Sequence, residues 1–252
     1  MKSLIICLFL ALSICLTSCY GTDDDTDKVC NENCNIFNGR IYTENNVGIA
    51  NVEITLSHSF INIGANYNRI IAKSKTDNNG NYTIEAFIKD NEFNAGFFRL
   101  TIDENMIESS ITNEFYKPSE IVNQVSPTIN ECTFSDIENR TQIKTIDYKI
   151  PYKTNFVVNL NNFNLTTPND RFGVGNRIEY GFQLGNNKFL TKQNTSNGFG
   201  YANGLNTTLT ITGVFGKNYL TIYKFKSGLV DNVLETITIN NPNANPPLNY
   251  SY

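Results

Sequence analysis

The chain has 252 residues, of which 40% are hydrophobic, so it can bury a substantial core. Its 24 Asp and Glu residues outnumber its 20 Lys and Arg residues, which gives a formal net charge of −4 with a single histidine. No segment concentrates basic side chains, and this excludes the electrostatic footprint of a nucleic-acid-binding protein. We therefore expect no nucleic-acid partner.

The first residues have the proportions of an export signal. Lys2 precedes an apolar run over residues 4–16, which is shorter than the about 20 residues that span a bilayer and has the length of a signal-peptide core. Residues 16–19 (LTSC) then resemble the lipobox of bacterial lipoproteins. This resemblance implies that residues 1–18 are a signal peptide and that Cys19 carries the lipid. The other interpretation of the apolar run is a buried N-terminal strand or helix.

The residues that follow Cys19 bear on location. In such lipoproteins an Asp directly after the cysteine retains the protein at the inner membrane, whereas Tyr20 stands here and implies the outer membrane. Residues 23–27 (DDDTD) resemble the tag that sends lipoproteins to the cell surface in polysaccharide-degrading Gram-negative bacteria, and they also suit a solvated tether. We expect a flexible lipidated tether over residues 19–34, with a reach of roughly 45 Å at about 3.3 Å per residue. The membrane is thus an expected partner through the lipid anchor.

From residue 35 onward, apolar and polar residues alternate, which is typical of half-buried strands. The alternation predicts five strands in the first part of the chain, over residues 36–42, 50–56, 69–75, 82–87 and 97–102. Asn79 and Gly80 lie between two of these runs, and an Asn-Gly pair in that position is a strong hairpin signal. We therefore expect the two flanking strands to pair.

Three segments of this region resemble the carboxypeptidase regulatory-like domain. They are residues 39–42 (GRIY), 48–54 (GIANVEI) and 76–84 (TDNNGNYTI). The resemblance implies a transthyretin-like sandwich that serves as a non-catalytic companion domain. We place this domain over residues 35–150, with a long insertion at about residues 104–140 that departs from the family pattern.

Later alternating segments, separated by Gly and Asn, predict a second β-sandwich over residues 151–240. Gly173 and Gly175 are predicted to form a turn, and the proline-containing residues 241–252 a flexible tail. The predicted fold class is therefore all-β, with two β-sandwich domains, transthyretin-like or Ig-like, after a lipoprotein signal peptide and a flexible tether.

Three cysteines remain besides Cys19 once the signal peptide is removed: Cys30, Cys34 and Cys132. An oxidising compartment favours one disulfide and one spare thiol. We predict Cys34 with Cys132, which would tie the start of the fold to a distant connection and contribute about 4–5 kcal/mol in the chain-entropy model. Cys30 with Cys132 is the alternative. Dispersed cysteines and one histidine form no zinc pattern, so no metal and no cofactor are expected.

No residue combination in the chain predicts catalysis. His58 is the only histidine, it stands in no recognised motif, and we predict that it is a surface or loop residue at a strand end. The two-histidine zinc site of true carboxypeptidases is therefore impossible. Asp77 resembles the start of a calcium loop, but the twelfth position is Ile88 where a glutamate is required. We predict that the chain is not an enzyme and has no catalytic residues.

One segment is a candidate for binding. Residues 194–204 are rich in glycine and amides and contain Phe199, Tyr201 and Asn203, which we predict as a tentative binding loop. Aromatic rings flanked by amides suit a glycan or protein partner. The alternative is an ordinary hairpin loop whose rings lie against the sheet. The expected function is a non-catalytic, surface-exposed outer-membrane lipoprotein that acts as a binding or adhesion module. The alternative function is a structural accessory subunit of an outer-membrane uptake or secretion complex.

Overall fold

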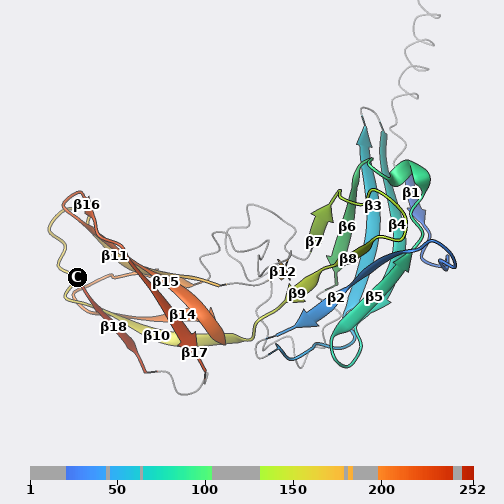
Figure 1. Cartoon of the computed structure of the whole chain (residues 1–252). Coiled ribbons are helices and arrows are strands. Elements are labelled where there is room, and N and C mark those ends of the chain that lie inside the picture. The colour runs from blue at the N-terminus through green and yellow to red at the C-terminus, as the bar shows by residue number, and fades with distance from the viewer. Residues whose placement is uncertain are drawn as a thin grey trace, which may run out of the picture.

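The computed structural model describes residues 21–43, 46–62, 65–103, 131–178, 181–183, 198–240 and 246–252. Its regular structure consists of β-strands together with the short 3-10 helix η2 (Asp90–Glu92), arranged in two lobes (Figure 1). The predicted all-β fold class is confirmed. Among the described residues, no helix has the length and apolarity needed to cross a membrane. The predicted signal peptide, Cys19 and Tyr20 lie outside the described residues.

The first lobe is a sandwich of two facing sheets. One sheet has the order β1-β4-β3-β6-β7, and the other has the order β12-β9-β2-β5 with β8 beside β2. Both sheets contribute to one core, in which Phe37 of β2 meets Phe98 of β6 and Phe134 of β7. The strands of this lobe are β1 (Gly21–Asp24), β2 (Asn35–Tyr42), β3 (Glu53–Asn62), β4 (Ala65–Lys75), β5 (Asn81–Ala86), β6 (Phe97–Ile102), β7 (Glu131–Phe134), β8 (Ile143–Thr145), β9 (Asp147–Lys149) and β12 (Gly181–Gln183).

The second lobe is also a sandwich, with its own core. A sheet of order β14-β10-β18 faces a sheet of order β13-β11-β15-β16, in which β17 also pairs with β15. Phe156, Val174 and Ile222 are among the residues buried between them. The strands are β10 (Lys153–Asn161), β11 (Arg171–Arg177), β13 (Gly198–Tyr201), β14 (Thr207–Val214), β15 (Gly216–Lys226), β16 (Leu229–Val230), β17 (Val233–Ile239) and β18 (Leu248–Ser251).

The alternation in the sequence explains these strands directly. Successive side chains of a strand point to opposite faces, so a period of two sends every second residue into the core. In β5, Tyr82, Ile84 and Ala86 are buried while the residues between them are exposed. The strand predicted over residues 97–102 is β6, with the same bounds.

The predicted Asn-Gly hairpin is wrong in its pairing, although the turn itself forms. Gly80 has a positive φ of 79°, and the Asp77 carboxylate accepts hydrogen bonds from the backbone of Asn79 and Asn81, each at 2.8 Å. The strands on either side then enter opposite sheets, because β4 pairs with β3 while β5 pairs with β2. The turn therefore connects the two layers of the sandwich.

Three predicted boundaries also need correction. Residues 21–24 of the expected tether form β1, which pairs in parallel with β4, and residues 248–251 of the expected flexible tail form β18, which pairs in parallel with β10. The segment at 131–134 of the predicted insertion is a strand that pairs with β6. The second half of the chain also returns to the first lobe at β12, where Phe182 joins the first core. Each segment finds its partner strand across a large sequence distance, which local patterning does not reveal.

The disulfide prediction is wrong as well. Cys30 is bonded to Cys34, with their Cα atoms 5.9 Å apart, and Cys132 is a free, buried thiol. Cys34 directly precedes β2, whereas Cys132 lies on β7 of the opposite sheet and points into the core. Burial raises the pKa of the Cys132 thiol to about 11, so this thiol is kept in its unreactive form.

Candidate functional site

An open groove runs along the outer face of the second sandwich. It encloses about 460 Å³ between β11, β15 and β17, and it is lined by Gly175, Arg177, Tyr219, Tyr223 and Leu234 among others; we call it the aromatic groove. The guanidinium of Arg177 lies 5.6 Å from the centre of the Tyr219 ring, in cation–π geometry. The side chain of Leu234 is 78% exposed. The groove thus offers rings, an apolar side chain and a positive charge to a ligand.

Two glycines make room for the rings beside this groove. A Cβ atom at Gly173 would lie 2.4 Å from the Tyr201 ring, and one at Gly175 would lie 3.0 Å from the Tyr223 ring. The rings of Tyr201 and Tyr223 therefore lie across the bare backbone of β11. Gly173 and Gly175 were predicted to form a turn, which is wrong, because they are the outward-facing positions of a central strand.

The structure divides the tentative binding loop. Phe199 and Tyr201 lie on strand β13 and are 49% and 45% exposed. Their rings meet edge to face with centroids 4.5 Å apart, and Phe199 also contacts Tyr223 at 5.9 Å. Asn203 is separate from this cluster, because its side chain accepts a hydrogen bond from Thr207 within its own turn. The rings thus extend the aromatic face of the sheet.

Sequence reasoning missed the other side of the groove. Arg177, Tyr219 and Tyr223 belong to two strands that pair antiparallel, with Arg177 opposite Tyr219. A signal for them exists in the sequence, since Tyr219, Thr221 and Tyr223 alternate with the core residues of β15. Aromatic residues at the outward positions of a strand indicate an exposed face, but only the register shows that they share it with Arg177.

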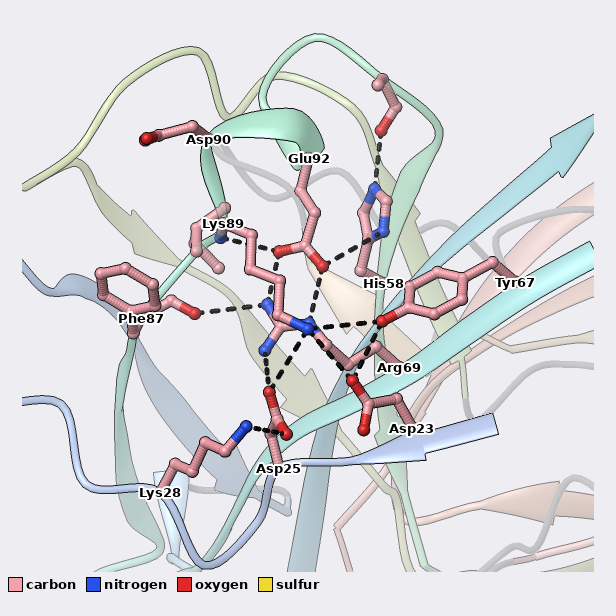
Figure 2. A network of polar contacts seen from close by, with 12 residues as sticks. Asp23, Asp25, Lys28, His58, Tyr67, Arg69, Phe87, Lys89, Asp90 and Glu92 are labelled. Atoms are coloured by element: carbon pink, nitrogen blue, oxygen red, sulfur yellow. Dashed lines mark hydrogen bonds and ion pairs between the residues drawn. The ribbon is translucent and has the colours of Figure 1, made fainter. Parts of the chain in front are cut away.

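A second unusual site is buried in the first sandwich, at the end of β1 (Figure 2). The Arg69 side chain is 2% exposed and lies between the carboxylates of Asp25 and Glu92. Its Nε donates to Glu92 at 2.6 Å, and Nη1 donates to Asp25 at 3.1 Å. A buried arginine is tolerated only when its donors are satisfied by charged acceptors in this way. We call these residues, with Asp23, Tyr67 and Lys89, the charged clamp.

Lys89 and Tyr67 complete the charged clamp on its outer side. The ammonium of Lys89 donates to Asp23 at 3.0 Å and lies 3.6 Å from Asp25, while the Tyr67 hydroxyl donates to Asp23 at 3.2 Å. The hydrogen bond from Lys89 lowers the pKa of Asp23. A hydrogen bond from Lys28 is the largest effect on Asp25, and it lowers the pKa of that carboxyl against the opposing effect of burial. Both acids are thereby held in their charged form.

The acidic run therefore has a structural role that was not predicted. Of the residues in the run at 23–27, Asp23 and Asp25 bind cations of β4 and of the segment before η2. Asp25 is 4% exposed. A flexible solvated tether over the whole of residues 19–34 is excluded, because the chain is already fixed to the sheet at Gly21.

His58 was predicted at the surface, and this is wrong. It lies within β3 with 2% of its surface exposed, its Nε2 donates to the Ala95 carbonyl at 2.6 Å, and its ring centroid lies 4.9 Å from that of Phe98. Its Nδ1 lies 3.7 Å from Glu92, beyond hydrogen-bond distance. The histidine is thus a core residue beside the charged clamp. In the described part of the chain, no three His, Cys, Asp or Glu residues are placed to hold a metal ion.

No model of a known protein family matches the chain, and no curated protein matches it. The resemblance to the carboxypeptidase regulatory-like family therefore stays a prediction. Among solved structures, the match to the Bacillus anthracis TIE protein covers 87% of the present chain and 33% of the TIE chain, with 11% sequence identity and a TM-score of 0.30. The match to a streptococcal ancillary pilin covers 88% of the present chain and 62% of the pilin chain, with 10% sequence identity and a TM-score of 0.30.

The tip fimbrial protein Mfa3 from Porphyromonas gingivalis, in a C-terminally truncated form, matches 80% of each chain with 11% identity and a TM-score of 0.26. The present chain thus spans about a third of the TIE protein and less than two thirds of the streptococcal pilin. At such TM-scores these likenesses identify neither a shared fold nor a shared function. The all-β, two-sandwich architecture rests on the strands of the chain itself.

Proposed function

We propose that the chain is a non-catalytic bacterial lipoprotein, anchored to the outer membrane through Cys19 and facing outward, that binds a glycan or protein partner with its second sandwich. The observation that carries the proposal is the aromatic groove, in which the half-buried rings of Tyr219 and Tyr223 lie beside the exposed Arg177 on one face of a sheet. Rings stack on the apolar faces of sugars or on apolar side chains, and the guanidinium donates to carboxylate or hydroxyl oxygens. Function by binding, without chemistry, fits the burial of the single histidine in the core.

A glycan array tests the binding half of this proposal. The detergent-solubilised chain is applied to neutral and uronic-acid-containing oligosaccharides, beside the variants Tyr223→Ala and Arg177→Ala. We expect both variants to lose the signal, and Arg177→Ala to lose most on the acidic sugars. The matched control is Arg140→Ala, which removes an arginine from the first sandwich that is likewise placed over aromatic rings. Equal binding by all variants would contradict the assignment of the groove.

The anchoring half is tested by Cys19→Ala. We expect the variant to lose incorporation of labelled palmitate and to leave the membrane fraction, while the unmodified chain on intact cells is accessible to added protease. Membrane retention of the variant would contradict the lipid anchor, and protection from protease would contradict the outward orientation.

A second candidate function is an accessory subunit of an outer-membrane complex, and strand β17 favours it. Among the described residues β17 pairs only with β15, and most of its side chains are exposed, including Val233 and Leu234. An exposed strand edge can accept a further strand from a partner protein. Crosslinking in intact cells from Thr236→Cys would reveal such a partner, whereas a groove that binds only sugars would leave this position uncrosslinked.

A further inference from the structure

Strand β1 begins at Gly21, two residues after Cys19, the proposed site of lipidation. Gly21 pairs with Tyr67 of β4, and Tyr67 pairs with Phe60 of β3, so the three residues lie side by side across the sheet. At about 4.8 Å between neighbouring strands, the Gly21 and Phe60 backbones are about 10 Å apart. Cys19 precedes Gly21 by two residues, which extend over at most about 8 Å. A lipid on Cys19 is therefore attached close to Phe60.

The direction of β1 selects which end of the sheet this is. Because β1 runs parallel to β4, the first residue of β1, Gly21, lies beside Tyr67, close to Ala65, where β4 begins. Ala65 pairs with Asn62 at the end of the β3–β4 hairpin. Figure 1 shows β3 and β4 extending past β1 at this end. Strand β1 thus begins at the end of the sheet that carries the hairpin.

The hairpin end has the chemistry of a membrane-contacting surface. Phe60 is 38% exposed and Ile61 is 70% exposed, and because they are consecutive they point to opposite faces of the hairpin. The described hairpin residues 60–62 and 65–68 contain no charged side chain, so none of them carries an ionised group that must lose water as this part of the hairpin approaches a bilayer. In the charged clamp, Asp23 and Lys89 pair with each other.

We propose that this hairpin end is a membrane-contact site, at which Phe60 and Ile61 enter the headgroup–acyl boundary of the bilayer that holds the lipid of Cys19. The inference rests on the proposed lipidation. Each apolar side chain that leaves water makes the free energy of membrane contact more favourable. The lipid anchor holds Phe60 and Ile61 beside the bilayer at a high effective concentration. A contact that is too weak to recruit a free protein is therefore sufficient to orient an anchored one. The charged clamp fixes β1 to the sheet and transmits this orientation to the whole first sandwich.

The absence of tryptophan from the sequence provides a clean reporter. Ile61→Trp introduces one fluorophore on the hairpin, and Val47→Trp, at a site that is 53% exposed in the segment between β2 and β3, is the matched control. Both variants are reconstituted in phosphatidylethanolamine–phosphatidylglycerol vesicles with and without brominated acyl chains. We expect the emission of Ile61→Trp to shift to shorter wavelength and to lose intensity with brominated lipid, while Val47→Trp shows neither change.

The anchor is supplied in two ways so that the outcomes separate. First, mass spectrometry shows whether the protein purified from cells carries lipid on Cys19. In parallel, a chain that starts at Cys19 is coupled through this cysteine to a maleimide phospholipid. The coupling is selective for Cys19 because Cys30 and Cys34 are bonded to each other and Cys132 is buried. Unlipidated protein from cells overturns the proposed anchoring, while quenching of the coupled Ile61→Trp still supports the hairpin contact. Equal quenching of Ile61→Trp and Val47→Trp on both anchors overturns the membrane-contact site and leaves the lipid anchor standing.

Discussion

The two sandwiches place their unusual side chains on opposite sides of their sheets. The first sandwich buries charge, with Arg69 enclosed between Asp25 and Glu92. The second carries aromatic rings on its outer face, where Phe199 and Tyr201 are exposed and Tyr223 is half-buried beside them. Buried charge tolerates little change, because each partner compensates the desolvation of the other. Exposed rings are nearly free to change, because the core does not depend on them. The comparison indicates a first sandwich built to hold its N-terminal strand and a second built to present a surface.

The largest expected effect comes from breaking the charged clamp. Arg69→Ala leaves the buried Glu92 carboxylate without its cation and removes one of the three cations around Asp25, and we expect it to destabilise the first sandwich by about 3–5 kcal/mol. Amide hydrogen exchange resolved by segment should show faster exchange in β1 and β4 and unchanged exchange in β15. The matched control is Arg177→Ala on the exposed groove, which should leave exchange in both sandwiches nearly unchanged. Equal effects of the two variants would contradict the contrast between the sandwiches.

Acid should weaken the same clamp gradually. The folded state lowers the pKa of Asp23 and of Asp25, so their stabilisation is fully present above the unfolded value of about 3.9 and is lost as the pH falls below it. We expect the exchange of β1 to accelerate as the pH, after correction for intrinsic exchange rates, is lowered through this range. Asp25→Asn should reduce stability at neutral pH and make the acid dependence shallower. An unchanged slope would mean that Asp25 does not carry the effect.

A smaller effect on stability is expected from filling the space that Gly173 leaves for the Tyr201 ring in the second sandwich. Gly173→Ala places a methyl group against the Tyr201 ring and 2.8 Å from the Gly200 carbonyl oxygen, so we expect a loss of about 1–3 kcal/mol in the free energy of unfolding. Gly204→Ala is the control, because a Cβ there meets nothing within 4 Å. Denaturant unfolding compares the two. Equal stabilities would show that Tyr201 moves aside at no cost.

The smallest expected effect on stability is that of Tyr201→Ala. The side chain is 45% exposed, and its edge-to-face contact with Phe199 contributes about 0.5–1.5 kcal/mol at most. We expect a stability within this margin of the unmodified chain, together with weaker binding of any ligand that the aromatic groove retains. A loss as large as that of Arg69→Ala would show that the ring is structural, and the exposed face would then lose its interpretation as a binding surface.

The individual elements show how far sequence reasoning reaches here. Residues 97–102 could be assigned to a strand because their alternation is complete within six residues. The strongest turn signal, at Asn79 and Gly80, correctly predicted a turn but not which strands would pair, because pairing depends on two sheets that the local sequence does not distinguish. Phe199 and Tyr201 were predicted as part of a tentative binding loop, with rings lying against the sheet as the alternative, and the structure shows both partly exposed. Tyr219 and Tyr223 were not predicted, since their shared face with Arg177 follows from the register of β11 and β15.

The sequence by itself determined the fold class and the presence of two sandwiches, because a period of two is a property of neighbouring residues. Only the tertiary structure decided which groups meet. Asp25 pairs with Arg69, Cys34 bonds to Cys30, and His58 donates to the Ala95 carbonyl. Gly173 leaves the space that the Tyr201 ring occupies. The physical reason is that a charge, a thiol or a ring is stabilised by whichever group the strand register brings within a few ångströms. For residues 21–24, the structure thus shows a strand where a tether was expected, and this strand begins two residues after the proposed lipid anchor.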